Sequence, residues 1–278
     1  MITARAAAAG MCLTALTAAA QPESARYSVR FDSPWSPQTH AGAYPFDAHY
    51  SPPVGAVHSN RVAFWEPGGT ASFGMELMAE LGSTGPLQGE MTNAINRGDA
   101  LVTFRGSRLD SPGSHDPIEF EASLDHDRLT LVTMVAPSPD WFVGTHGLPL
   151  RDADGDWIQS ITVGLDVYDA GTDSGPEFTS GNADVTPHLP IANISQDPPF
   201  AGLPQLGSFT ITLIDVSGCP GDVNDDGQVT DSDFFAWVTA FVADPRSPEE
   251  EAACNVNRDG GCSDSDFFAW VTAFVDGC

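Results

Sequence analysis

Two acidic, glycine-bearing loops near the C-terminus carry oxygen-bearing side chains at a repeated spacing. The loops begin at residues 222 and 255, and each has such side chains at positions 1, 3, 5, 9 and 12, with Gly at position 6. This is the spacing of a twelve-residue calcium loop, in which position 7 contributes its backbone carbonyl. The predicted ligands are Asp222, Asn224, Asp226, Gln228, Thr230 and Asp233 in the first loop, and Asn255, Asn257, Asp259, Gly261, Ser263 and Asp266 in the second.

Glycine explains how so short a segment could surround an ion. Calcium takes about 6 to 8 oxygen ligands at roughly 2.3 to 2.6 Å, so the chain has to turn sharply around it. Gly227 and Gly260 permit that turn because glycine adopts positive φ without a Cβ penalty. The alternative is a pair of plain acidic turns, against which the duplication of the following segment argues.

That following segment is a perfect repeat. Residues 231–242 read DSDFFAWVTAFV, and residues 264–275 repeat the same letters. Apolar residues three and four positions apart predict a helix after each loop, packed against its twin. Each helix has more apolar surface than one partner helix covers, which predicts a docking patch. Between the copies, Ser247, Pro248 and Glu250 are typical of a helix N-terminus with a capping box.

Residues 219–278 resemble a bacterial dockerin module: a loop, a helix, a linker, then a second loop and helix, with Asp closing each loop. The resemblance implies two calcium ions and binding to a cohesin-like or cell-surface receptor. Recognition residues of the family stand at loop positions 10 and 11, which implies partner contacts by Asp231, Ser232, Asp264 and Ser265. The helices depart from the family by lacking Lys or Arg on the exposed face, so the receptor need not be an ordinary cohesin.

Four cysteines frame this module: Cys219, Cys254, Cys262 and Cys278. In an oxidising compartment they predict two disulfides, for which three pairings are possible. We favour Cys219–Cys278 at the ends of the module and Cys254–Cys262 beside the second loop. A small module needs such covalent support because its own core contributes little stability. A zinc site is the alternative, but no CxxC pair or nearby His supports it.

Residues 1–20 have the features of a secretory signal peptide. One Arg precedes an apolar, alanine-rich stretch, and three alanines offer a small-residue cleavage site before Gln21. The alternative is a disordered alanine-rich start. No other run approaches the length that would insert in a membrane, so we expect a secreted or cell-surface protein.

Composition narrows the class of partner. The chain has 278 residues, a formal charge of −27 and no Lys, so we exclude nucleic acid and anionic membrane as principal partners. Its 27 glycines and 22 prolines, with only 18% charged residues, favour a loop-rich β domain.

The sequence pattern of residues 27–216 is typical of a mainly β, sandwich-like domain. Alternating or buried strands are predicted at 27–31, 101–104, 118–122, 129–135 and 209–214, with a few helical turns at 75–81. Turns rich in Gly and Pro separate them, which favours an antiparallel β-sandwich.

Six segments of this region, in order, resemble a spondin N-terminal domain, the family that includes F-spondin and mindin. They are WSPQTH at 35–40, GAVHS at 55–59, ASFG at 71–74, AELG at 79–82, PSPDWFVG at 137–144 and YDAGTDSG at 168–175. The resemblance implies a C2-like β-sandwich that recognises an extracellular protein or glycan. It also implies one calcium ion at one end, held by Asp140, Asp169 and Asp173. Three carboxylates on two Gly/Pro-rich loops could form a hard-cation site, although Asp is also a frequent turn former.

Catalytic motifs give no support for an enzyme. The chain lacks GxSxG, HExxH and a P-loop, and Asp173-Ser174-Gly175 has no second copy, which an aspartic protease would need. We expect His40 and His58 to be packed or hydrogen-bonded. The sequence therefore predicts a secreted, calcium-loaded binding protein. The alternatives are a dockerin-borne hydrolase in polysaccharide degradation, and a tail that acts as a sorting signal.

Overall fold

The computed structural model describes residues 24–153, 155–217, 221–224, 229–257 and 261–276. The chain divides into two compact units, the first ending at Ser217 and the second comprising the C-terminal tail. Each unit is considered by itself. The predicted signal peptide lies outside the described residues.

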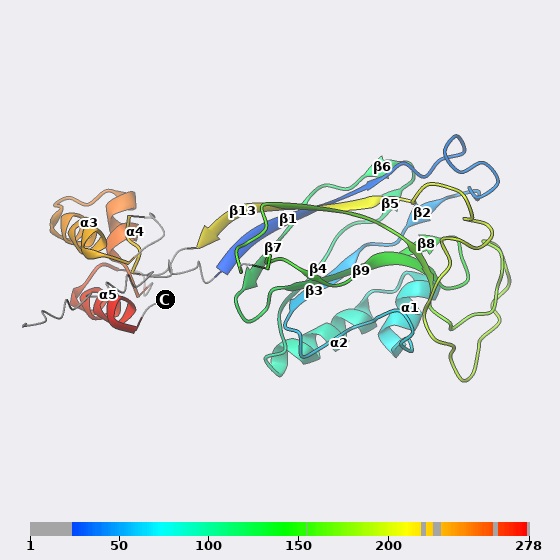
Figure 1. Cartoon of the computed structure of the whole chain (residues 1–278), viewed down its shortest axis with the longest axis horizontal. Helices are drawn as coiled ribbons and strands as arrows, with labels where there is room; N and C mark the ends of the chain where they lie inside the picture. The colour runs from blue at the N-terminus through cyan, green and yellow to red at the C-terminus, as the bar shows by residue number, and fades with distance from the viewer. Residues whose placement is uncertain (1–23, 154, 218–220, 225–228, 258–260, 277–278) are drawn as a thin grey trace, which may run out of the picture. The chain divides into compact units, whose positions relative to one another are not determined.

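In one antiparallel sheet of the first unit, the first and last strands of the unit, β1 and β13, lie side by side (Figure 1). In β1 every second residue is buried, among them Tyr27, Val29 and Phe31, because only one face of this sheet meets the core. The order is β10-β13-β1-β6, and β7 also pairs with β1. The bounds are β1 Ser24–Ser33, β6 Gly113–Ser114, β7 Ile118–Ser123, β10 Ser160–Gly164 and β13 Ser208–Ser217.

The second antiparallel sheet has both faces covered. Its central strand β8 is buried along almost its whole length, with Leu129 and Leu131 in the core between the sheets and Val132 and Met134 on the opposite face. The order is β12-β11-β9-β8-β2-β5, with β3 between β8 and β4. The bounds are β2 His49–Tyr50, β3 Val54–His58, β4 Ala100–Arg105, β5 Leu109–Asp110, β8 Arg128–Ala136, β9 Trp141–Pro149, β11 Val167–Asp169 and β12 Ala192–Asn193.

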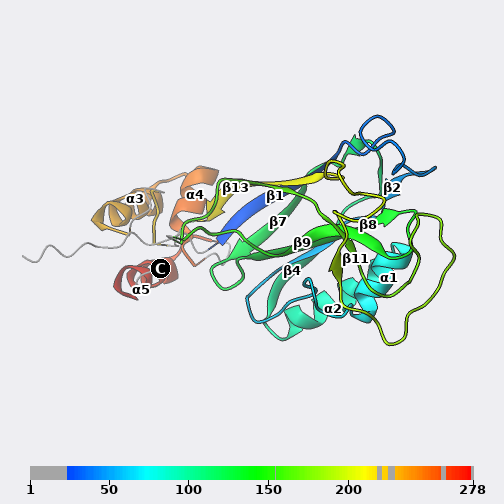
Figure 2. The ribbon, with the colours of Figure 1, turned by 45° about the vertical axis from the view of Figure 1, so that its right-hand side comes forward.

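Two helices, α1 Phe73–Leu81 and α2 Gly85–Asn96, cover the outer face of the second sheet (Figure 2). Helix α1 begins after Ser72, whose side chain accepts the N–H of Met75, and ends at Gly82 with φ of 64°. The expected turns at 75–81 are confirmed. Helix α2 is not predicted; in the structure its N-cap Thr84 makes no side-chain cap bond.

The tail unit is helical, with α3 Asp231–Val242, α4 Pro248–Cys254 and α5 Asp264–Asp276. Both repeat copies form the expected helices, and Ser247 and Glu250 form the expected capping box at the start of α4. Helices α3 and α5 pack through their aromatic rings. The ring centroids of Phe234 and Trp270 lie 5.1 Å apart, and those of Trp237 and Phe267 lie 5.6 Å apart.

The predicted fold class is confirmed: a mainly β chain of antiparallel sheets with a small helical tail. The five predicted strands correspond to β1, β4, β7, β8 and β13. Within the described residues, no helix is long and apolar enough to span a membrane.

Candidate functional site

Each of the two tail loops has the same hydrogen-bonded frame, built on the Asp at position 12. Asp233 is fully buried, and its carboxylate accepts the N–H of Asn224 at 3.1 Å and the N–H of Thr230 at 2.8 Å. In the second loop, the equally buried Asp266 accepts the N–H of Asn257 at 3.0 Å and that of Ser263 at 2.8 Å. Each Asp therefore caps its helix and ties positions 3 and 9 of its loop together.

Oxygen atoms at position 1 of both loops are withdrawn from water. Asp222 is buried, and the Oδ1 atom of Asn255 is buried without a hydrogen-bond partner among the described residues. A buried amide oxygen is normally satisfied, so Asn255 lacks a partner that a bound cation would supply. Asp226, Gln228 and Asp259 lie outside the described residues.

The four residues expected to contact a partner are exposed in the first turns of α3 and α5. Ser232 accepts a hydrogen bond from the Asn224 side-chain amide at 3.0 Å, and Ser265 accepts one from Asn257 at 2.9 Å. Position 3 of each loop is thus bonded to position 11, so the geometry of the loop fixes the place of the surface serine. Asp231 and Asp264 stand beside them.

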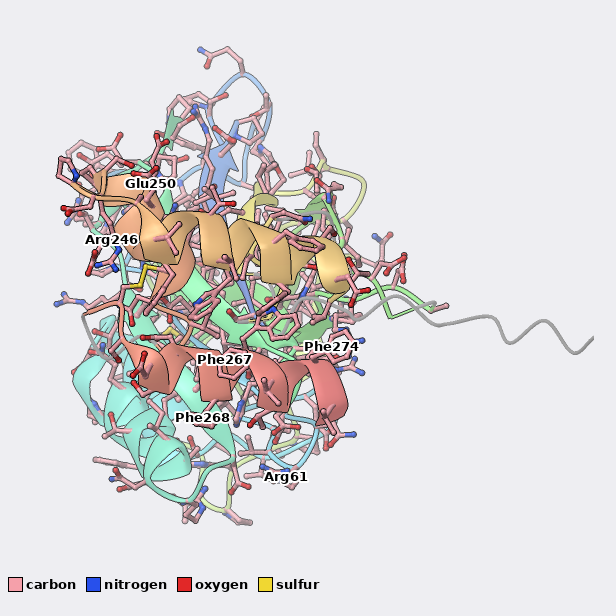
Figure 3. All side chains as sticks on the ribbon, turned by 90° about the vertical axis from the view of Figure 1, so that its left-hand side faces the viewer. Arg61, Arg246, Glu250, Phe267, Phe268 and Phe274 are labelled. Carbon is pink, nitrogen blue, oxygen red and sulfur yellow. A yellow bond between two sulfur atoms is a disulfide. The ribbon has the colours of Figure 1, made fainter. Side chains whose placement is uncertain are left out.

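The surplus apolar surface predicted for the helices is present. Phe235 of α3 and Phe268 of α5 occupy equivalent repeat positions and are 67% and 68% exposed. Figure 3 shows Phe268 on α5. Phe274 and Val275 add exposed apolar surface near the end of α5.

A disulfide joins Cys254 to Cys262, as expected, with an S–S distance of 2.05 Å. It connects the last residue of α4 to the second loop, where the Cys262 N–H donates to the Glu251 carboxylate at 3.1 Å. The other favoured pair, Cys219–Cys278, lies outside the described residues.

In the first unit, Asp140 is a buried carboxylate with one unsatisfied oxygen. Its Oδ2 atom accepts the N–H groups of Thr172 at 2.8 Å and Asp173 at 3.0 Å, whereas Oδ1 has no partner among the described residues. Burial, and then the charge of Asp169, raise the pKa of Asp140 to about 6. A cation beside Oδ1 would remove both costs.

Asp169 and Asp173 lie near Asp140 but also shape the turn between them. Asp169 accepts the N–H of Gly171 at 2.8 Å, and burial raises its pKa. Gly171 has φ of 74°, and a Cβ there would lie 2.3 Å from the Leu189 carbonyl oxygen, so only glycine fits. The carboxylate oxygens of Asp173 accept the N–H groups of Gly175 and Ala183, each at 2.9 Å. Asp169 and Asp173 therefore stabilise the turn through their hydrogen bonds, whereas Asp140 is the residue of the three with an unsatisfied oxygen.

Three other side chains of the first unit have possible metal-ligand atoms close together. Among the described residues, ligand atoms of Glu76, Asp184 and His188 lie within 4.8 Å of one another. His188 Nε2 is 4.0 Å from Glu76 Oε2. Sequence reasoning missed this group because α1 and the 184–188 loop are far apart in the chain.

Both histidines considered for catalysis are structural, as expected. His40 is fully buried, with Nε2 2.9 Å from the Pro204 carbonyl oxygen and Nδ1 2.8 Å from the Thr39 hydroxyl. His58 donates from Nδ1 to the Ser59 carbonyl at 2.7 Å, and its Nε2 lies 2.8 Å from the Thr130 hydroxyl.

Comparison with known proteins covers both units. Residues 25–202 match the family model Spondin_N, and residues 220–272 match that of the Dockerin type I domain. Spondin-1 of Rattus norvegicus is 34% identical over 198 residues, which are 67% of this chain and 24% of that protein. Spondin-1 of Homo sapiens has the same identity and coverage. Spondin-2 of Homo sapiens is 33% identical over 182 residues, 63% of this chain and 54% of that protein. The chain therefore spans about a quarter of spondin-1 and about half of spondin-2.

Proposed function

Because the chain belongs to the Spondin_N family and carries a type I dockerin domain behind that region, we infer that it is a secreted, calcium-dependent adaptor. Its spondin-type unit recognises an extracellular protein or glycan. Its dockerin-type tail anchors that unit to a cohesin-like or cell-surface receptor.

The duplicated frame of Asp233 and Asp266 carries this proposal. Both carboxylates are fully buried, and each is bonded to backbone N–H groups of a loop rich in further oxygen ligands. Buried carboxylates are costly unless they are paired or coordinate a metal. Calcium in each loop would supply the missing positive charge, and its binding free energy would stabilise the tail. Ser232 and Ser265 would then be fixed through Asn224 and Asn257.

The proposal includes a third calcium ion in the spondin-type unit. Asp140, Asp169 and Asp173 are its ligands, and the buried, unsatisfied Oδ1 atom of Asp140 supports it. The role of this ion is structural. It neutralises the buried charge of Asp140 at the place where Asp140 contacts residues 169–173.

Binding rather than catalysis is the proposed role of both units. Neither matched domain is a catalytic one. The packed states of His40 and His58 leave neither imidazole available as a general base. A panel of glycan and peptide substrates tests this, because turnover by the full chain would support the dockerin-borne hydrolase instead.

The anchoring function is tested by capture from the native cell envelope. We expect the full chain to retain one receptor in calcium and to release it in chelator. The double substitution S232A/S265A should weaken capture about tenfold, since both copies of the polar contact are lost. The matched control is T239A/T272A, which alters the exposed threonines in the middle of the same helices. Undiminished capture by S232A/S265A would remove the two serines from the anchoring surface.

A further inference from the structure

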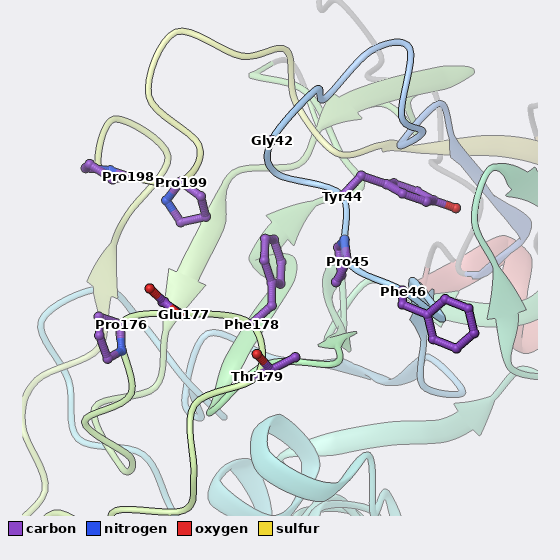
Figure 4. Close-up of a pocket in the computed structure, with 10 residues that line it drawn as sticks. All are labelled: Gly42, Tyr44, Pro45, Phe46, Pro176, Glu177, Phe178, Thr179, Pro198 and Pro199. Carbon is purple, nitrogen blue, oxygen red and sulfur yellow. The ribbon is translucent and has the colours of Figure 1, made fainter.

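A pocket of about 510 Å³ opens in the spondin-type unit between three loops (Figure 4). Residues 42–46 form one wall, residues 176–179 a second, and Pro198 with Pro199 the third. In the close-up, Phe178 lies between the loop that bears Pro45 and the loop that bears Pro199. The volume falls in the range of small-ligand sites.

Contacts beneath the pocket hold its walls in place. Phe178 packs on Trp35, Trp141 and Phe200, with ring centroids 5.9, 5.1 and 5.7 Å away. The Tyr44 hydroxyl donates to the Ser111 carbonyl at 2.6 Å. The site is therefore formed before a ligand arrives, which reduces the entropy lost on binding.

The second wall is also tethered at both ends. The carboxylate of Asp173 accepts the N–H of Gly175 on one side of residues 176–179 and the N–H of Ala183 on the other, each at 2.9 Å. Within that wall, Ser180 bonds to both the N–H and the carbonyl of Glu177 at 3.0 Å. The backbone of Glu177 is thus fixed.

The Glu177 carboxylate is the charged group of the pocket lining. It is exposed, and no ion pair or hydrogen bond joins it to another side chain among the described residues. Around it the lining consists mostly of aromatic rings and prolines, with Thr179 as a hydroxyl. A carboxylate with aromatic neighbours attracts a cation, both by its charge and through the negative faces of the rings.

A sugar fits this lining poorly, because its hydroxyls need several donors and acceptors and the side chains offer few. A guanidinium fits well: its flat faces stack on rings, its edge donates to a carboxylate, and it is weakly hydrated. The chain's formal charge of −27 also draws basic partners and repels acidic ones.

We propose that this pocket binds an arginine side chain presented by an extended segment of the extracellular partner protein. The proposal rests on the proposed recognition function of the spondin-type unit and specifies its ligand. The ring of Phe46 and the prolines contact the aliphatic stem and the guanidinium faces, and Glu177 pairs with the guanidinium edge. Neighbouring walls accept the flanking residues of the segment.

The probe is the blocked tripeptide N-acetyl-Pro-Arg-Pro-amide, titrated into the full chain in calcium and followed by nuclear magnetic resonance shifts of the lining residues. The same peptide with citrulline in place of arginine keeps the shape and removes the charge. We expect citrulline, E177Q and F46A each to weaken binding about tenfold. Phe46 is 98% exposed, so its truncation leaves the core intact.

Matched controls are E66Q, which changes another exposed glutamate, and F73A, which truncates a ring that is 65% exposed on α1. Both should bind the arginine peptide as the wild type does. Equal binding of the citrulline peptide, or full binding by E177Q, would overturn the proposal. Shifts at the pocket with cellobiose and none with the arginine peptide would assign it to a glycan. In either case, calcium-dependent capture through the tail would show that the anchoring function still holds.

Discussion

At the scale of single residues, Asp140 combines full burial with one unsatisfied oxygen. Its pKa, raised from 3.8 to about 6, means that the ionised form costs about 3 kcal/mol in the folded state. Because the folded-state pKa lies above the unfolded one, Asp140 contributes stability below about pH 4 and loses it as the pH rises through about 6. A calcium ion would reverse that loss at neutral pH.

The substitution D140N tests this role. In chelator at pH 7, we expect the variant to be at least as stable as the wild type, because no charge is buried. Calcium should then raise the thermal midpoint of the wild-type spondin-type unit but leave that of D140N unchanged. The exposed Asp116 provides the control D116N, which should respond to calcium as the wild type does. The same calcium shift in D140N would show that Asp140 is no ligand.

His58 predicts a second pH dependence, of opposite sign. Burial lowers the pKa of His58, and its neutral ring donates to Ser59 and accepts from the Thr130 hydroxyl, which itself accepts the Gly147 N–H. The folded-state pKa is below the unfolded value of 6.5, so this stability is present above pH 6.5 and declines as the pH falls.

Asp140 gains stability over the same pH range, so the contribution of His58 is measured as a difference between variants. From pH 7.5 to 5.5, we expect the thermal midpoint of the first unit to fall less, or to rise more, in H58Q than in the wild type. The exposed His146 supplies the control H146Q, which should keep the wild-type pH dependence. An unchanged pH dependence in H58Q would assign the acid sensitivity to other groups.

At the scale of elements, the two loops illustrate how one side chain can serve two purposes. Asp233 caps α3 through the Thr230 N–H and closes the loop through the Asn224 N–H. Loss of a cap costs about 1 kcal/mol, and each buried N–H left without a partner adds roughly 1 to 3 kcal/mol.

We therefore expect D233A to destabilise the tail by about 2 to 4 kcal/mol and to abolish calcium binding by the first loop. The control D231A alters an exposed acid in the same helical turn and should cost less than about 0.5 kcal/mol. Calorimetric calcium titration of both full-length variants separates the two. If D233A kept both tail ions, position 12 would not be a ligand.

What could be predicted from the sequence follows from periodicity and repetition. Alternation predicts β1, a continuous apolar run predicts β8, and the repeated twelve residues predict α3 and α5. The two-residue strands β2, β5, β6 and β12 are too short to leave a pattern. The tail loops can be predicted from the sequence because all their expected ligands lie within one short segment of the chain.

Features assembled from distant segments could not be predicted. The group of Glu76, Asp184 and His188 joins a helix to a loop about a hundred residues later, and no spacing indicates it. The pocket likewise requires three loops whose proximity depends on the packing of Trp35 and Trp141 against Phe178. Tertiary structure alone brings such residues together.

At the scale of the whole molecule, the chain has two compact units with different sources of stability. The spondin-type unit has a large core between its sheets and a second one beneath α1 and α2. The tail has a small aromatic cluster around Trp237 and Trp270, one disulfide in its described part, and two fully buried acids whose charge we propose that calcium balances. We therefore expect calcium to matter most for the tail, as in other small metal-dependent domains.

Differential scanning calorimetry of the full chain, with its disulfides oxidised, tests this most directly. In calcium we expect the tail to unfold in its own transition, and chelator should lower that midpoint by 10 °C or more, because removal of two ions withdraws several kcal/mol from a small domain. The transition of the spondin-type unit should move less. A tail transition at the same temperature with and without calcium would contradict the account of this protein as a calcium-dependent adaptor.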